Sequence, residues 1–216
     1  MKTIKALIGK YRHGLLLIYW SLFAMIFYLF ENVLPLTFNT IWCPIDDYIP
    51  FNEFFIIPYY AWYILMFGML ALLFFRNPPE FKFYMWSIII GYSIALLTYA
   101  IYPNQQLLRP DSFERNNIFT QLVADLYRTD TYTNVCPSIH VIGQMAVFFA
   151  AWRNPLGNRT FWRVVWIVST VAVCASTVFL KQHSFVDVVA GLIVSLAVYL
   201  AVYHLSQRRS KSNCGD

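Results

Sequence analysis

Long apolar runs alternate with short polar segments along this 216-residue chain. Six runs stand out, over residues 14–36, 54–75, 84–102, 137–152, 161–181 and 184–204. A membrane-crossing helix needs about 20 apolar residues, so each run predicts one transmembrane helix, and the fourth is the shortest. Only Lys181-Gln182-His183 separates the last two runs. We expect this triplet to form a tight turn, because about 40 residues are too many for one crossing.

The longest polar segment, residues 103–136, carries a helical pattern of its own. Asp111-Ser112 can cap a helix, and apolar residues follow at helical spacing. They are Ile118, Leu122, Val123 and Leu126. We predict a short amphipathic helix over about 112–128 that lies in the membrane interface, where it either roofs a site or packs on the bundle. The predicted fold is therefore all-α, with residues 1–216 forming one six-span domain.

The composition is that of a polytopic membrane protein. Hydrophobic residues make up 59% of the chain and charged residues 12%, whereas soluble domains carry about 25% charged residues. The aromatic share of 19% is typical of chains with Trp and Tyr at membrane interfaces. The net charge of +5 does not indicate a nucleic-acid partner, because the basic residues cluster at helix ends. The expected partner is the bilayer, and the oligomeric state is unknown from the sequence.

Basic residues mark alternate loops, which sets the orientation. The four basic clusters are Lys2, Lys5, Lys10 and Arg12; Arg76 and Lys82; Arg153, Arg159 and Arg163; and Arg208, Arg209 and Lys211. By the positive-inside rule, we predict a multi-pass protein of the cell membrane with both termini cytoplasmic. The polar residues Arg109, His140, Lys181 and His183 then share the extracytoplasmic face. Convergence of several reactive groups on one face indicates an active site.

Two histidines at the ends of apolar runs are the strongest candidates for chemistry, since ionisable groups are costly there. Asp187 follows His183 by four residues, so on a helix the carboxylate can hydrogen-bond the imidazole. We expect His183 to be a nucleophile that Asp187 orients, and His140 to be the general acid and base. The alternative for His183 alone is a helix-end histidine that donates to a carbonyl group.

Other polar residues are candidates for binding the substrate. Ser138 can cap the helix of His140, where free N–H groups favour an anion. Arg109 suits phosphate geometry, or it contacts lipid headgroups at the interface. Lys181 either binds phosphate or extends its amine to the interface. Asp130 either orients a cation or contacts a headgroup. Weaker acidic candidates of the same kind are Asp46, Asp47 and Glu53.

The sequence predicts no metal and no cofactor. Its cysteines lack zinc-site spacing, and neither a Walker loop nor a dinucleotide signature occurs. Cys43 and Cys136 both fall in predicted outer loops, which leaves a disulfide between them open.

These motifs resemble the type 2 phosphatidic acid phosphatase superfamily of integral membrane proteins. The similar stretches are Arg109-Pro110, Pro137-Ser138-Ile139-His140, and His183 with Asp187. The resemblance covers about residues 85–204. It implies a six-helix core, metal-independent hydrolysis, a phosphohistidine at His183 and an acid–base role for His140.

Three positions depart from that family pattern. Tyr102 stands where the first motif has lysine, Ile139 replaces a glycine, and Thr177 replaces an arginine. Two phosphate-binding cations are thus missing, and Lys181 is the obvious substitute. Cys-Pro-Ser-Ile-His and Lys-Gln-His are similar to the branch of inositol phosphorylceramide synthase-like proteins, whose members can transfer a headgroup to an alcohol.

Three functions follow from these observations. The first is a phosphatase acting at the outer leaflet on a lipid phosphate or diphosphate, such as phosphatidic acid, phosphatidylglycerophosphate or a polyprenyl diphosphate. The second is a phosphotransferase with an alcohol acceptor on the same histidine chemistry. The third is a non-catalytic lipid transporter, which is disfavoured because transporters place polar groups near the bilayer midplane.

Overall fold

The computed structural model describes residues 9–34, 36–154 and 159–212, so Lys2 and Lys5 lie outside the described residues. It confirms the all-α class. The long helices are α2 (Ile18–Asn32), α4 (Ile56–Arg76), α5 (Pro78–Ile101), α7 (Ile139–Arg153), α8 (Thr160–Phe179) and α9 (Phe185–Ser212). The 3-10 helices η1 (Arg12–Leu17) and η2 (Glu53–Phe55) lead into α2 and α4.

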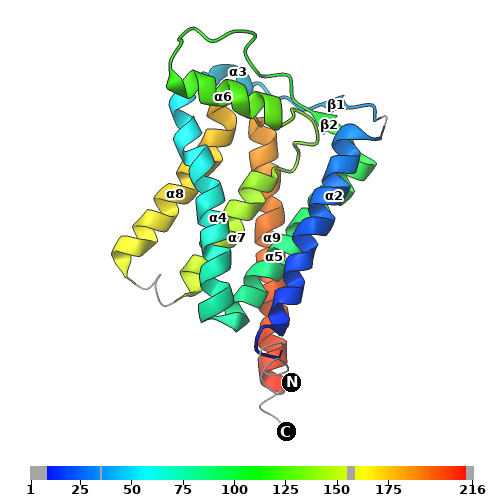
Figure 1. The fold of residues 1–216 in the computed structure, drawn as a ribbon, viewed down its shortest axis with the longest axis vertical. Coiled ribbons are helices and arrows are strands. Elements are labelled where there is room, and N and C mark those ends of the chain that lie inside the picture. Colours follow the sequence, from blue (N-terminus) through cyan, green and yellow to red (C-terminus); the bar gives the residue numbers. More distant parts are fainter. Residues whose placement is uncertain (1–8, 35, 155–158, 213–216) are drawn as a thin grey trace.

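A layer of short elements covers one end of the bundle (Figure 1). It contains α3 (Ile45–Tyr48), α6 (Ile118–Thr129), and the strands β1 (Asn39–Thr40) and β2 (Asn104–Gln105), which pair in parallel. The start of α2 and the last turns of α9 lie at the opposite end (Figure 1). The layer joins loops that are far apart in sequence above the helix ends that carry both histidines.

Five helical segments in the described part of the chain are long and apolar enough to cross a membrane. They are Arg12–Asn32, Glu53–Arg76, Pro78–Ile101, Thr160–Phe179 and Phe185–Leu205. The fourth expected span corresponds to α7, which has 15 residues. At 1.5 Å per residue this helix is about 22 Å long, shorter than the hydrocarbon core of about 30 Å. Five of the six expected spans therefore have a helix of sufficient length, and six spans are not confirmed.

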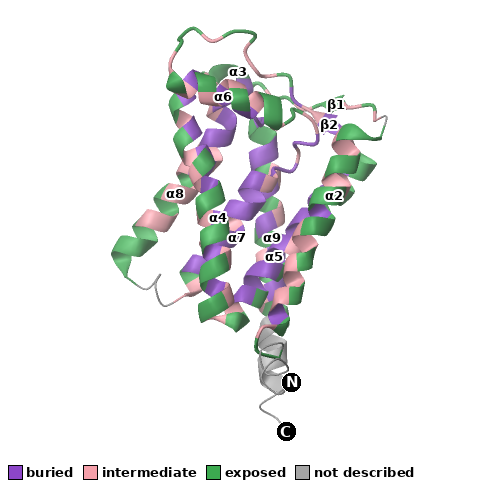
Figure 2. Cartoon of the chain, viewed as in Figure 1, coloured by how far each residue is buried: buried purple, intermediate pink, exposed green. Residues whose placement is uncertain are grey.

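The short helix α7 lies at the centre of the bundle, packed against α4, α5, α8 and α9. Figure 2 shows buried positions concentrated on α7 and on the helix faces around it. Close packing depends on glycine at several positions. A Cβ at Gly143 would lie 2.7 Å from Tyr92 Oη, and one at Gly191 would lie 3.1 Å from the Ser138 carbonyl oxygen. Because neighbouring helices surround it, α7 need not match the membrane thickness.

The largest differences from the predicted helix starts occur at two helices. The third long helix starts at Pro78 instead of residue 84, because Asn77 caps it by accepting the Glu80 N–H and proline suits the first helical position. The amphipathic helix starts at Ile118 instead of residue 112, because its cap is Asn117 and not Asp111-Ser112. The expected tight turn before α9 is confirmed, since α8 ends at Phe179 and α9 begins at Phe185.

Candidate active site

The two histidine motifs meet at the covered end of the bundle. His140 lies in the first turn of α7, and His183 lies in the turn that precedes α9. Nδ1 of His140 is 3.2 Å from Nε2 of His183, and each residue is only 5% exposed. The Ser138 N–H donates to the Asp187 carbonyl oxygen at 3.2 Å. The starts of α7 and α9 are therefore joined directly, which fixes the spacing of the rings.

Asp187 supports His183 as the sequence spacing predicts, but from a different geometry. Its Oδ2 lies 3.2 Å from Nδ1 of His183 and also accepts the Ser184 N–H at 2.9 Å. His183 precedes the helix, so the two residues do not share a helical face. Asp187 is instead the third residue of α9 and reaches back over its first turn, as the acidic residue of a capping box does. The carboxylate is fully buried.

His140 is also linked to a carboxylate, that of Asp130, through the hydroxyl group of a tyrosine. Tyr59 Oη of α4 donates to Asp130 Oδ2 at 2.6 Å and lies 2.8 Å from Nε2 of His140. Asp130 Oδ2 itself is 4.0 Å from that nitrogen. Burial raises the pKa of Asp130, while the hydrogen bond from Tyr59 opposes the rise. Sequence analysis missed Tyr59, because nothing distinguishes it from the other aromatic residues of its apolar run.

One arrangement of the ring protons satisfies these contacts. The Tyr59 hydroxyl proton goes to Asp130, so Nε2–H of His140 donates to the Tyr59 oxygen. Nδ1–H of His183 donates to Asp187, which accepts only. The facing nitrogens, Nδ1 of His140 and Nε2 of His183, then need one shared proton to make their 3.2 Å contact. With that proton on His140, the His140 ring carries a proton on both nitrogens and is an imidazolium, and Nε2 of His183 faces it without a proton of its own.

Ser138 lies beside the same nitrogen. Its Oγ is 3.2 Å from Nε2 of His183 and accepts the Val141 N–H at 3.4 Å, as an N-cap residue does. The first turn of α7 also presents free N–H groups and the positive end of the helix dipole. An anion next to Nε2 of His183 would therefore meet a hydroxyl group and helix-start donors.

Arg109 lies at the edge of the site, where it holds main-chain carbonyl groups. Its guanidinium group donates to the carbonyl oxygens of Tyr127 (3.1 Å), Asp130 (2.8 Å) and Thr131 (2.9 Å). It also donates to the Gln182 side chain, next to His183. Burial lowers its pKa, and the Asp130 charge opposes this. Gln182, which the sequence did not single out, thus links the predicted phosphate ligand Arg109 to the turn that carries His183.

Lys181 points to the layer above the bundle. Its Nζ donates to the Asp46 carbonyl oxygen at 2.8 Å, and burial lowers its pKa, with the nearby Asp46 and Asp47 charges opposing. Asp46, a weaker candidate by sequence, is 2% exposed. Its carboxylate accepts the Ser184 hydroxyl (2.6 Å) and the Phe185 N–H (2.7 Å). Asp46 therefore fixes the start of α9, immediately after His183.

Asn104 organises the loop that leads into α7. It is fully buried, and its Oδ1 accepts the N–H groups of Val135 (2.9 Å) and Cys136 (2.8 Å). Its Nδ2 donates to the Cys136 carbonyl oxygen at 2.9 Å. Tyr99 Oη adds a bond to the Pro137 carbonyl oxygen at 2.8 Å. Sequence analysis missed Asn104, since a single asparagine after an apolar run is ordinary loop composition.

The end of α2 that carries Glu31 is tied to the same region. Glu31 accepts hydrogen bonds from the side chains of Thr131, Thr133 and Asn134. These residues follow Asp130, so the carboxylate of α2 holds the segment that joins α6 to the His140 motif.

The cysteines near the site are free. Cys43 and Cys136 do not form a disulfide. Burial, together with the neighbouring Asp187, raises the pKa of Cys136 to about 12, so its thiol stays protonated beside that carboxylate. Among the residues that the structure describes, no group of three or more His, Cys, Asp or Glu could hold a metal ion.

His140 and His183 both lie in the part of the chain that matches the model of a known protein family. Residues 105–211 match the PAP2 superfamily. The match supports this superfamily for the chain, whereas the inositol phosphorylceramide synthase-like branch is not confirmed. PAP2 is the type 2 phosphatidic acid phosphatase superfamily that the sequence motifs resemble. Membership of this superfamily is consistent with phosphatase or phosphotransferase activity. The matched segment contains every predicted PAP2 site residue, from Arg109 to Asp187. No curated protein and no solved structure matches the chain.

Proposed function

We propose that this protein hydrolyses a lipid phosphate or diphosphate at the extracytoplasmic face of the cell membrane, through a phosphohistidine and without a metal ion. The observation that carries the proposal is the 3.2 Å contact between Nδ1 of His140 and Nε2 of His183. The outer nitrogen of each ring is already bonded, to Tyr59 and to Asp187. Only the facing nitrogens are left for chemistry on a substrate placed between them.

In the first step, the two rings move apart from their 3.2 Å contact and the phosphate group enters between the facing nitrogens. Nε2 of His183 attacks phosphorus, and the bond from phosphorus to the lipid oxygen breaks. His140 gives its Nδ1 proton to that oxygen, so the lipid leaves as an alcohol, or as a monophosphate from a diphosphate. Asp187 stabilises the positive charge that develops on His183, because its carboxylate accepts a hydrogen bond from Nδ1–H of the ring at 3.2 Å.

In the second step, His140 acts as a base. Its free Nδ1 takes a proton from water, and the oxygen attacks phosphorus as the bond to Nε2 of His183 breaks. Inorganic phosphate leaves, and both rings return to their starting state. Ser138 and the first turn of α7 bind the phosphoryl oxygens in both steps. Arg109 contributes positive charge from the edge of the site.

The bundle is oriented with both termini in the cytoplasm. All six long helices cross the membrane in this proposal, α7 as a short central helix that begins below the outer surface. The amphipathic helix α6 lies in the outer interface. The support is the position of η1 and the last turns of α9 at the end opposite the site (Figure 1), together with the basic loops of the sequence.

Burial of the site favours a second candidate, the phosphotransferase. His140 and His183 are each 5% exposed, so a bound alcohol could exclude water and take the phosphoryl group. All steps are then the same, except that His140 deprotonates the alcohol in the second step.

The test is phosphate release by the purified protein from a panel of lipid phosphates and diphosphates, with EDTA present. We expect release that disappears in His183→Ala while the variant keeps the thermal unfolding temperature of the parent. Activity that EDTA removes and added metal restores would contradict the metal-free mechanism. A phosphorylated alcohol that forms only when an alcohol acceptor is supplied, without release of inorganic phosphate, would establish the transferase instead.

A further inference from the structure

A cavity of about 520 Å³ lies between α2 and α4 and reaches His140. This volume is within the usual ligand-pocket range of about 300–1,000 Å³. Glu31, Arg128 and Asp130 give its lining a polar part near the layer of short elements. Trp20, Phe23 and Met66, from the transmembrane helices, give it an apolar part. The lining therefore changes from polar to apolar along the bundle.

We propose that this cavity binds the apolar chain of the substrate, and the inference rests on the proposed function above. The occupant is a lipid phosphate whose phosphate lies at the His140 end and whose chain extends between α2 and α4. A bilayer lipid is polar at the interface and apolar toward the midplane, which is the same order as in the lining. The chain can stay at this depth while the phosphate reaches the rings.

The histidine that lines the cavity supports the direction of the chain. His140 lines it, and His183 is not part of the lining. In the proposed mechanism His140 protonates the leaving oxygen, and this oxygen carries the lipid chain. An in-line attack by His183 places nucleophile and leaving group on opposite sides of phosphorus. The chain must therefore leave the site on the His140 side, where the cavity lies.

Unpaired donors in the lining point to an occupant that carries oxygen atoms. Trp62 is 4% exposed and lies with its ring centroid 4.5 Å from that of His140. Its indole N–H and that of Trp20 have no hydrogen-bond partner among the described residues. Both residues line the cavity. Buried donors are usually satisfied, and a lipid has acceptor oxygens next to its phosphate that can satisfy them.

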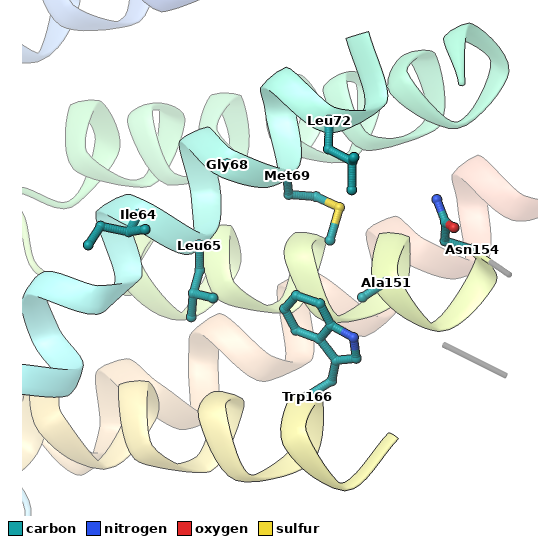
Figure 3. A pocket seen from close by; sticks show the side chains of 8 residues that line it. All are labelled: Ile64, Leu65, Gly68, Met69, Leu72, Ala151, Asn154 and Trp166. Carbon is teal, nitrogen blue, oxygen red and sulfur yellow. The ribbon is translucent and has the colours of Figure 1, made fainter. Parts of the chain in front are cut away.

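The first test fills the cavity. Ala24 of α2 lines it, and Ala24→Phe should obstruct the chain. The matched control is Gly68→Phe, because Gly68 lines a separate hollow of about 170 Å³ between α4, α7 and α8 (Figure 3) and its added Cβ would meet no atom within 4 Å. The readout is kcat/KM for a long-chain lipid phosphate and for a short water-soluble alkyl phosphate.

We expect Ala24→Phe to lower kcat/KM for the long-chain substrate at least about tenfold more than for the short one, since losing the burial of two methylene groups costs that much. Gly68→Phe should leave the ratio of the two values unchanged. Equal losses on both substrates, or the same ratio in both variants, would overturn the assignment.

The second test does not depend on turnover. A lipid phosphate with a photoreactive diazirine in its chain is supplied in vesicles, and the labelled peptides are identified by mass spectrometry. Labels should map to α2 and α4 and decrease in Ala24→Phe but not in Gly68→Phe. Labels confined to other helices would overturn the assignment. If no phosphate is released from any substrate while α2 and α4 are labelled, the proposed function fails and the chain site stands.

Discussion

His183 and His140 face each other across 3.2 Å, but the molecule supports them in different ways. The carboxylate behind His183 comes from the same chain segment, four residues later, and contacts the ring directly. The support of His140 comes from two other segments, through Tyr59 of α4 and Asp130 after α6. One ring is therefore held by local structure and the other by the packing of three separate elements.

The difference matches the two proposed roles. A nucleophile that becomes charged when it attacks gains most from a carboxylate in direct contact. A general acid and base must lose and regain its proton in every cycle, and a tyrosine between ring and carboxylate weakens the attraction for that proton. The variants below test this comparison, in order of decreasing expected effect.

The largest contrast is expected between substrates in His140→Ala. Without the acid, turnover of an alkyl phosphate should fall about 10²–10⁴-fold. An aryl phosphate with a good leaving group needs no proton in the first step. It should therefore still phosphorylate His183 and release one equivalent of phenolate per protein as a burst. Stopped-flow absorbance with p-nitrophenyl phosphate measures the burst. Equal losses of the first step on both substrates would remove His140 from the acid role.

Asp187→Asn should affect turnover more than Asp130→Asn. The amide cannot stabilise the charged His183 ring, so we expect kcat to fall at least about a hundredfold. For Asp130→Asn, which acts through Tyr59, we expect about a tenfold fall. Steady-state kcat and the thermal unfolding temperature of both variants provide the comparison. A larger loss of kcat in Asp130→Asn at equal stability would reverse the assignment of direct and indirect support.

Tyr59→Phe removes the hydroxyl bridge to His140 and keeps the ring. We expect kcat to fall about tenfold, similar to Asp130→Asn, because both variants break the same relay. In the double variant the losses should not add. The matched control is Tyr60→Phe, because the Tyr60 hydroxyl donates to the Leu122 carbonyl oxygen at 3.5 Å and not to the relay. The pH profile of kcat should change in Tyr59→Phe alone. Additive losses in the double variant would mean that Tyr59 and Asp130 act independently.

The same division between local and distant support explains what the sequence could predict. The helical class and the turn before α9 depend on residues close together in the chain, so spacing was sufficient. Spacing also predicted the contact of His183 with Asp187, although the two residues meet at a helix start and not on one helical face. The contact of Tyr59 with His140 joins residues 81 positions apart, and that of Asp46 with Ser184 joins residues 138 apart. Neither pair has a spacing signal, because only the packed bundle brings the partners together.

Helix starts show a related limit. Asp111-Ser112 was predicted to cap the amphipathic helix, and Asn117 was not considered. The structure selects Asn117, whose side chain accepts the N–H groups of Phe119 and Thr120 while Thr120 reaches back to it. The fourth apolar run, 137–152, does match α7 (Ile139–Arg153) in length. The pattern did not predict that a helix shielded by its neighbours can be shorter than a full apolar span.

The smallest effect is expected for Lys181, for which the sequence offered two roles. If Lys181 bound the substrate phosphate, removing its amine would raise KM strongly. The Lys181 Nζ contact with the Asp46 carbonyl oxygen at 2.8 Å instead favours a structural role. In that role, Lys181 holds Asp46 in place at the start of α9. For Lys181→Met we therefore expect KM to rise less than about threefold and stability to fall by about 1 kcal/mol, the usual contribution of one hydrogen bond.

Asp46→Asn separates the two roles of Lys181 further. It leaves the main-chain carbonyl that Lys181 contacts, but weakens the acceptors for Ser184 Oγ and the Phe185 N–H. It should therefore lower stability more than Lys181→Met, because hydrogen bonds to a charged group contribute about 1.5–3 kcal/mol. Chemical denaturation in detergent and KM for one lipid phosphate measure both variants. A KM increase of about tenfold in Lys181→Met with unchanged stability would instead identify the lysine as the cation that replaces the missing family residues.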